Sequence, residues 1–191
     1  MGSLEHIPVS LLGEVLMESG MDGLSLKRAL HSSGVCVGKP VSASAVEFHY
    51  QVRRSDLNQK GTLYGGRMMY LLDDVAAEIA ERHAGVVCAT LLVDSLKFVA
   101  PSHRDDTLLF QGSVNRVWNT SLEVGIRVTA RAPDSLEERH IVSAYLTFVA
   151  VDASGKPIHI CQAHPLTAEE KRRWRAAQRR RNYRIKTAVK K

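Results

Sequence analysis

The stretch from Asn58 to Ala77 reads NQKGTLYGGRMMYLLDDVAA, a polar turn that closes with two glycines and leads straight into a long apolar segment. Apolar residues from Tyr64 to His83 recur at helical spacing, which predicts a helix of about five turns. Glycines at a helix start allow close approach to the backbone and leave N–H groups at the positive end of the helix dipole. We therefore expect the amides of Gly65 and Gly66 to stabilise a carbonyl oxygen that gains negative charge.

The predicted helix also carries an acidic residue, Asp73, within its apolar sequence. Asp73 lies seven residues beyond Gly66, nearly two turns, so the two residues share a face but stand ~10 Å apart along the axis. A carboxylate at that distance cannot serve a carbonyl bound to Gly66 of its own chain. Two antiparallel helices related by a two-fold axis would bring each Asp73 to the glycines of the other chain, which predicts a dimer with two composite sites. The neighbouring Asp74 is turned about 100° away, and we expect it to be exposed.

Five segments rich in strand-forming residues flank this helix, one before it and four after it, and turn residues separate them. A helix this apolar must be covered by other structure on most sides. One helix followed by four successive strands predicts an α+β fold in which the helix packs on a mostly antiparallel sheet. The expected strands are 45–52, 86–99, 108–117, 121–131 and 141–151, and the helix stripe comprises Met68, Leu72, Val75, Ala76 and Ile79, widened by Met69, Leu71 and Ala80.

The predicted folded domain covers residues 44–165 and has an extension at each end. Residues 1–43 show no sustained pattern, so we expect a loosely packed or disordered arm. Residues 166–191 open with a capping box, in which Thr167 precedes Glu170 by three positions. They continue as a surface helix to about Tyr183, which we expect to fray from Lys186 to Lys191. Residues 167–191 contain 11 Lys or Arg and 2 Asp or Glu, so the net charge of +6 arises in this tail.

Composition and cysteine usage narrow the class of protein. With 191 residues, 45% of them hydrophobic and 24% charged, the chain has the balance of a soluble globular protein, and no run approaches the roughly 18 apolar residues of a membrane span. The three cysteines are odd in number and lack CxxC spacing, so we expect no disulfide framework and an intracellular protein, cytoplasmic or mitochondrial. The eight histidines are scattered, without HExxH or a Cys/His cluster, so we predict no metal site.

Five short motifs along residues 48–157 carry a family resemblance. In this series the chain resembles the hotdog-fold acyl-CoA thioesterases, particularly the bacterial short-acyl-CoA and brain-type acyl-CoA hydrolase branch. The motifs are Asp56-x-Asn58-x-x-Gly61-Thr62-Leu63-Tyr64-Gly65-Gly66 followed by Asp73-x-x-Ala76, Val93-Asp94-Ser95-Leu96-Lys97-Phe98 with Pro101, Thr120-Ser121-Leu122-Glu123-Val124, Thr147-Phe148-Val149-Ala150-Val151-Asp152, and Gly155-Lys156-Pro157.

The resemblance implies a long central helix wrapped by a curved antiparallel sheet, with two chains paired edge to edge into a double-hotdog dimer and such dimers assembled into trimers of dimers. It implies hydrolysis of the thioester of acyl-CoA to free carboxylic acid and coenzyme A, with no cofactor beyond the coenzyme A of the substrate. The implied catalytic residues are Asn58, Gly65 and Gly66 from one chain and Asp73 from the other. The implied substrate-binding residues are Thr90, Arg116, Thr120, Ser121, Gly155 and Lys156.

The catalytic set permits two routes. Asp73 would act as general base on water or as a nucleophile through an anhydride, while the amide of Asn58 would hold the water or the carbonyl. Two positions depart from the family pattern: Trp118-Asn119 replaces a frequent Gly-Arg that contacts the nucleotide, and Asp105 replaces a usual turn glycine.

Other functions remain open from the sequence. A hydratase or dehydratase on the same fold would use a His near the helix start, where this chain has none. A non-enzymatic module would bind acyl-CoA or nucleic acid. The tail helix is expected to be solvated, to contact the phosphates of coenzyme A, or to bind nucleic acid or an anionic membrane through Trp174 and Tyr183 among its arginines.

Overall fold

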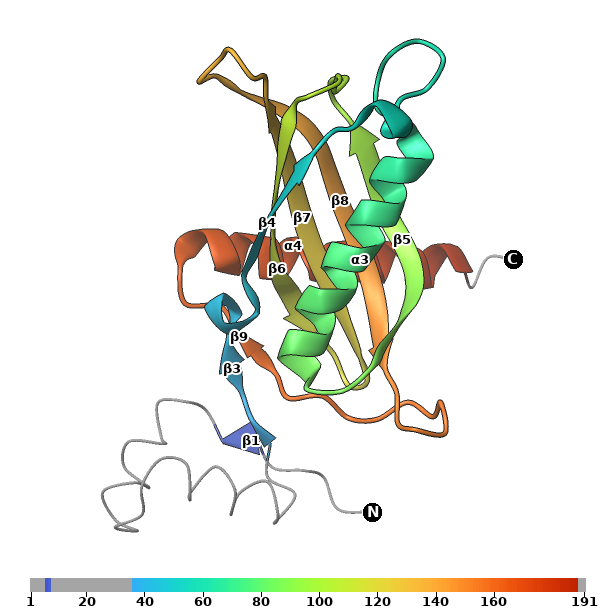
Figure 1. Cartoon of the computed structure of the whole chain (residues 1–191). Coiled ribbons are helices and arrows are strands. Elements are labelled where there is room, and N and C mark those ends of the chain that lie inside the picture. The colour runs from blue at the N-terminus through green and yellow to red at the C-terminus, as the bar shows by residue number, and fades with distance from the viewer. Residues whose placement is uncertain (1–5, 8–35, 189–191) are drawn as a thin grey trace.

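Helix α3 (Gly65–Ala84) lies along the concave face of a curved five-stranded sheet, as Figure 1 shows. The computed structural model describes residues 6–7 and 36–188. Neighbouring strands of the sheet are all antiparallel, and their order is β4–β6–β7–β8–β5. This confirms the predicted α+β architecture. The strands are β4 (Val46–Gln51), β5 (Cys88–Phe98), β6 (Thr107–Val117), β7 (Ser121–Arg131) and β8 (Glu138–Ala150).

The predicted apolar stripe of α3 packs into the sheet, with one exception. Met69 is 48% exposed, because it lies one turn before Asp73 on the side of the helix where a cavity opens between α3 and β5. The helix ends at Gly85, which adopts the left-handed conformation (φ 76°) that favours glycine, and whose N–H donates to the carbonyl of Glu81. The buried residues of α3 are Met68, Leu71, Leu72, Val75, Ala76, Ile79, Ala80 and His83.

Residues 36–44 belong to the packed body, which therefore begins before the predicted boundary at residue 44. Strand β2 (Cys36–Val37) pairs in parallel with β1 (His6–Ile7), and β3 (Lys39–Pro40) pairs in parallel with β9 (Ala163–His164). The short helix η1 (Val41–Ser44) follows, and both of its end residues are buried. A second such helix, η2 (Arg54–Asp56), precedes the turn before α3. The rest of the predicted arm, residues 1–5 and 8–35, lies outside the described residues.

A disulfide joins Cys36 to Cys161, contrary to the expectation from the cysteine pattern. The parallel pairing of β3 with β9 brings the two residues together although 125 positions separate them in the sequence. An odd number of cysteines still allows one bridge, and Cys88 is the free thiol. The sequence pattern was an unreliable guide here because the pairing depends on tertiary contacts between the two ends of the chain.

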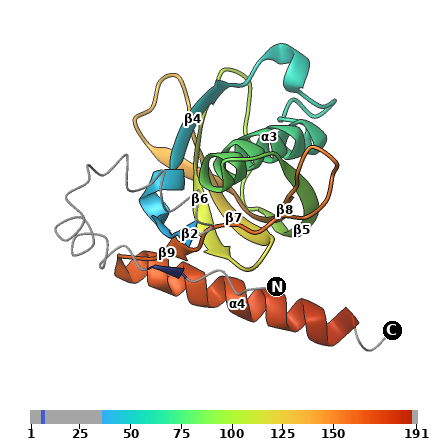
Figure 2. The same cartoon turned by 90° about the horizontal axis from the view of Figure 1, so that it is seen from below.

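Helix α4 (Ala168–Ala188) crosses the outer face of the sheet, opposite α3, as Figure 2 shows. Its predicted capping box is confirmed: Thr167 Oγ1 accepts from the N–H of Glu170 at 3.1 Å, and the Glu170 carboxylate accepts from the N–H of Thr167 at 2.9 Å. The helix continues through Ala188, so the predicted fraying from Lys186 is wrong for the described residues.

Arginines hold α4 against the sheet, so it is not a freely solvated helix. Arg180 pairs with Glu123 of β7 through both carboxylate oxygens, at 2.6 and 3.0 Å, and Glu123 is fully buried. Arg184 pairs with Asp94 of β5. Ala177, about one turn before Arg180, is 0% exposed. Buried carboxylates beneath the helix therefore anchor the basic tail.

Within the described residues, none of the helices combines the length and the apolar character that a membrane crossing requires. Across the same residues, no group of three or more His, Cys, Asp or Glu side chains is arranged to hold a metal ion.

The disulfide predicts the number of reactive thiols. Burial raises the pKa of the Cys88 thiol to about 11, so the protein must be denatured before that thiol reacts freely. Denatured protein without reductant should show one thiol per chain by a chromogenic thiol reagent, and reduced protein should show three. Cys36→Ser should raise the unreduced count to two, because it releases Cys161. Three reactive thiols without reductant would contradict the bridge.

Candidate active site

The start of α3 presents free backbone donors. The carbonyl of Tyr64 accepts from the N–H groups of Arg67 and Met68 at 3.0 and 3.1 Å. The amides of Gly65 and Gly66 precede these and have no acceptor within the helix, nor does another backbone acceptor contact them in the described part of the chain. The helix dipole adds positive potential at the same place. This is the arrangement of donors that the sequence predicts.

Gly66 and Gly65 differ in the space around them. A Cβ atom on Gly66 would lie 2.5 Å from a ring carbon of Tyr64, whereas a Cβ atom on Gly65 would meet the ring of Phe98 at an ordinary 3.7 Å. The Tyr64 side chain is 60% exposed and is free to turn. Glycine at position 66 therefore lets Tyr64 lie over the helix start, while position 65 has room for a methyl group.

The turn before α3 is fastened by a buried carboxylate, Asp56. One of its oxygens accepts from the Tyr50 hydroxyl at 2.7 Å and the Arg53 N–H at 2.8 Å, and the other lies 3.3 Å from Nε of Arg67. Burial alone would raise the pKa of Asp56, but the two hydrogen bonds and the charge of Arg67 outweigh it, so the pKa falls below its usual value. The ionised Asp56 thus ties the turn to the first turn of α3.

The side chain of Asn58 is used within its own turn. Its Oδ1 accepts from the N–H of Lys60 at 2.8 Å and of Thr62 at 3.3 Å, and its Nδ2 donates to Thr62 Oγ1 at 2.8 Å. These bonds shape the turn that leads to the glycines. In the single chain, Asn58 therefore shapes the backbone at the helix start, and its amide does not lie against Asp73.

Asp73 is paired with Thr90 at the wall of a pocket. Thr90 of β5 donates its hydroxyl to Asp73 Oδ1 at 2.9 Å, and both residues are exposed. Gly66 and Asp73 line the same cavity of about 360 Å³, within the size range of ligand sites. We call this cavity the Asp73 pocket, and its lining residues are Gly66, Met69, Tyr70, Leu72, Asp73, Val93, Leu96, Ala144 and Leu146.

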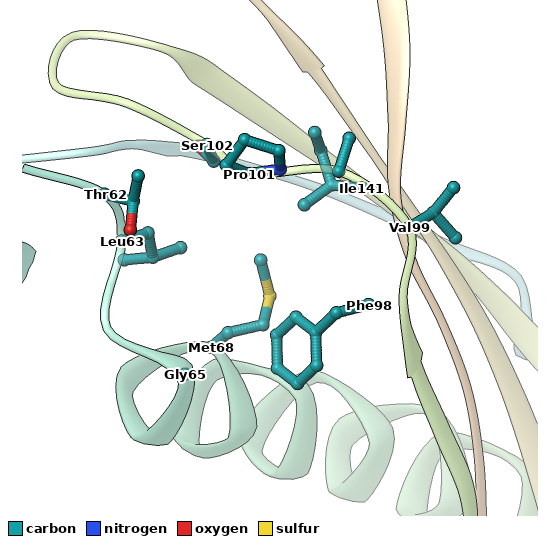
Figure 3. A pocket seen from close by; sticks show the side chains of 10 residues that line it. Thr62, Leu63, Gly65, Met68, Phe98, Val99, Pro101, Ser102 and Ile141 are labelled. Carbon is teal, nitrogen blue, oxygen red and sulfur yellow. The ribbon is translucent and has the colours of Figure 1, made fainter. Parts of the chain in front are cut away.

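A second cavity of about 360 Å³ lies on the other side of the helix start, beside Gly65. Figure 3 shows Met68 from α3 and Phe98 from β5 at its wall, with Leu63 from the turn opposite. Ile141 and Pro101 close the side nearest the sheet. The backbone of Gly65 and Gly66 therefore separates two largely apolar hollows.

The predicted substrate-binding residues divide between two places. Arg116 and Ser121 lie on the outer face of the sheet under α4, where the Arg116 guanidinium stacks 3.4 Å from the centre of the Trp174 ring and Ser121 Oγ accepts from Arg181 at 3.1 Å. Their side chains do not reach the Asp73 pocket within this chain. For Arg116 the cause is a bulge in β6, where Asn115 is an extra residue and shifts Arg116 to pair with Glu123.

Thr120, Gly155 and Lys156 lie in turns. Thr120 is in the β6–β7 turn, where its carbonyl accepts from the N–H of Ala150 at 2.9 Å. Gly155 has φ 78°, and the N–H of Lys156 donates to Asp152 Oδ1 at 3.0 Å. The structure therefore brings together Gly66, Asp73 and Thr90, and leaves these turn residues apart from them.

Sequence reasoning missed the residues that hold the site in place. Asp56 belonged to the quoted motif without a role, and Arg67 follows Gly66 directly, yet their pairing needs the fold of the intervening turn. Val93 and Leu96 were also missed, because their spacing of three positions does not predict one face of a regular strand. The opposite charges of Asp56 and Arg67 on the two sides of the turn were the one signal available in the sequence.

Known proteins match the chain over most of its folded body. The thioesterase superfamily matches residues 60–136. An uncharacterised acyl-CoA thioester hydrolase of Bacillus subtilis, YkhA, is 34% identical over 115 residues, which is 60% of this chain and 67% of the relative.

Solved structures of similar proteins share the fold of this chain over most of its length. A hexameric acyl-CoA thioesterase in its apo form has a TM-score of 0.77 and 35% identity, and the match covers 79% of this chain and 97% of that one. The acyl-CoA hydrolase of Staphylococcus aureus, solved with butyryl coenzyme A and coenzyme A, has a TM-score of 0.75 and 30% identity over 80% of this chain and 93% of that one. Further structures of the latter carry alanine in place of one aspartate, one threonine or one asparagine.

The fold of this chain and the free amides at the start of α3 are consistent with its similarity to these thioesterases. The chain belongs to the thioesterase superfamily and has the hotdog fold of the acyl-CoA thioester hydrolases.

Proposed function

We propose that this chain hydrolyses acyl-CoA thioesters at sites completed by a second copy of itself. Water adds its oxygen to the thioester carbonyl carbon, the carbon–sulfur bond breaks, and the proton from water passes to the leaving sulfur. The products are a free carboxylic acid and coenzyme A. The observation that carries the proposal is the Thr90–Asp73 hydrogen bond of 2.9 Å at a cavity that Gly66, at the start of the same helix, also lines.

The backbone amides, Thr90 and Asp73 each have a distinct role in the proposed hydrolysis. The amides of Gly65 and Gly66 donate to the carbonyl oxygen as it becomes negative, a role in which one donor is worth about 10²–10³ in rate. The Thr90 hydroxyl occupies Asp73 Oδ1 and leaves Oδ2 to accept a proton from water or to attack the carbonyl carbon. Both routes use the same side chains, and coenzyme A enters only as part of the substrate.

Two features support a second copy of the chain: the axial distance between Gly66 and Asp73, and the exposed apolar surface around the site. Large apolar side chains stand exposed around the site: Tyr64 is 60%, Tyr70 56% and Phe98 50% exposed. Strand β5 is at the edge of the sheet, so a second chain has backbone groups to pair with there. We propose that two chains join at this edge, which would cover the apolar residues and bring each Asp73 toward the other chain's Gly66.

The substituted positions of the Staphylococcus aureus hydrolase support this set of residues. In that protein the substituted asparagine precedes the substituted aspartate by 15 positions, and the substituted threonine follows the aspartate by 17. The same separations join Asn58 to Asp73 and Asp73 to Thr90. Assembly beyond the dimer into a hexamer, the state described for one of the similar structures, is part of the proposal.

Coenzyme A binding is proposed for the exposed turns. Beside Gly155, the Lys156 ammonium and the Thr120 hydroxyl would donate to its phosphates, whereas Arg116 and Ser121 are engaged with α4. Of the two aromatic residues named for binding to a nucleic acid or an anionic membrane, Trp174 is covered by Arg116 and Tyr183 is exposed, and our proposal does not include that alternative partner. The intracellular location, cytoplasmic or mitochondrial, stays a prediction from the sequence.

Replacement of Asp73 tests the function. Asp73→Ala should lower the rate of thiol release from acyl-CoA by about 10²–10⁴-fold, because the proton acceptor or nucleophile is lost. Asp74→Ala is the matched control: Asp74 is an exposed neighbour on the same helix, and its loss should leave the rate close to that of the unaltered protein. Equal rates for both variants, or no turnover of any acyl-CoA by the unaltered protein, would refute the proposal.

Replacement of the glycines tests the donors at the helix start. Gly66→Ala should lower the rate about 10²-fold, because the new methyl group and the displaced Tyr64 ring obstruct the approach of the carbonyl. Gly65→Ala should have a much smaller effect, because its methyl group meets only an ordinary contact. Both variants should unfold at temperatures close to that of the unaltered protein. The reverse order of effects on the rate would show that Gly66 is not the critical donor.

A further inference from the structure

Strand β5 presents an irregular row of side chains to helix α3. Residues of the row face buried residues of β8: Thr90 pairs with Phe148, Val93 with Leu146, and Leu96 with Ala144. Cross-strand partners lie on the same face of a sheet, so these three β5 residues all point toward α3. Their spacing is three positions, although a regular strand repeats its face every two.

Two bulges produce this spacing. The pairing of β5 with β8 shifts between Thr90 and Leu92 and again between Val93 and Ser95, so Leu91 and Asp94 are the extra residues. Each extra residue shifts the alternation by one position, so that the helix side is reached again two residues later, at Val93 and at Leu96. Without the second bulge, Leu96 would point away from the Asp73 pocket that Val93 lines. The inner wall of that pocket therefore depends on Asp94 occupying a bulge.

The bulge at Asp94 is held from the outer face of the sheet. Asp94 Oδ2 accepts from the Thr147 hydroxyl at 2.9 Å, and Oδ1 pairs with Arg184 of α4. The Asp94 side chain is 3% exposed, and Thr147 is buried. A carboxylate so deeply buried needs a charged partner. Arg184 is the cation paired with it among the described residues.

We propose that Asp94 and Arg184 are positioning residues for the acyl part of the substrate. Their ion pair holds the second bulge of β5, and through it holds Val93 and Leu96 at the wall of the Asp73 pocket. The tail helix thus shapes the site from the opposite face of the sheet. This inference rests on the proposed hydrolysis of acyl-CoA and extends it to the choice among acyl chains.

A second ion pair on the same helix provides the matched control. Arg180 holds Glu123, which sits at a regular position of the β7–β8 pairing, and the Glu123 carboxylate is fully buried. Loss of Arg180 removes an anchor of α4 of the same chemical kind and leaves the ion pair between Arg184 and the bulge residue Asp94 in place. Arg180→Ala therefore measures the effect of weaker docking of α4 alone. Arg184→Ala weakens the docking of α4 and also releases the bulge at Asp94, so the difference between the two variants measures the effect of the bulge.

The experiment compares four variants: Arg184→Ala, Arg184→Lys, Asp94→Asn and Arg180→Ala. The ratio of kcat/KM between a short and a long acyl-CoA should change about tenfold in Arg184→Ala and Asp94→Asn, mainly through KM. Arg184→Lys should restore the original ratio, because it keeps a cation beside Asp94. Arg180→Ala should lower the melting temperature at least as much as Arg184→Ala does, yet keep the original ratio.

Hydrogen exchange of residues 88–98 gives a readout that needs no substrate. Arg184→Ala should speed exchange in this strand at least about tenfold more than Arg180→Ala does. Unchanged ratios and unchanged exchange in Arg184→Ala, or equal changes in both arginine variants, would overturn the inference. If the unaltered protein hydrolyses no acyl-CoA, the proposed function fails, and the exchange measurement still decides whether Arg184 holds the bulge.

Discussion

The fixed rise per residue of helix α3 determines that the proposed active site needs residues from two chains. Gly66 and Asp73 lie on one rigid element, α3, and ~10 Å along its axis separates them because each residue advances the chain by 1.5 Å. No rotation of the Asp73 side chain would bring its carboxylate to a substrate carbonyl bound at Gly66 of the same chain. A two-fold pairing of antiparallel helices does so for both sites at once. The exposed apolar residues around the helix start and the unpaired edge of β5 are the features expected of a chain that works in this way.

The sheet connects the two helices that lie on its opposite faces. On the inner face it supports α3 and the Asp73 pocket, and on the outer face its buried carboxylates hold the arginines of α4. Strand β5 takes part in both, because Thr90 bonds Asp73 on one side and Asp94 bonds Arg184 on the other. A basic tail that the composition alone would assign to solvent or to a polyanion is therefore a structural part of the fold.

Local patterns in the sequence predicted the elements well, and the errors share one cause. Helical spacing, strand-forming runs and the Thr167–Glu170 capping box depend on neighbouring residues, and the structure confirms them. The disulfide and the docking of α4 join distant segments, which no local pattern reports. The position of Arg116 under α4 could not be read from the sequence, because one extra residue in β6 reverses the alternation beyond it. The catalytic set from the sequence stays a prediction.

Activity of mixed dimers tests the composite site most directly. Asp73→Ala and Gly66→Ala chains carrying different affinity tags would be combined and the mixed dimers purified through both tags. One site of each mixed dimer then lacks both groups and the other has both, so about half of the unaltered activity should return. A site contained within one chain would leave every site with one defect, and mixed dimers no more active than the two parent variants would contradict the account.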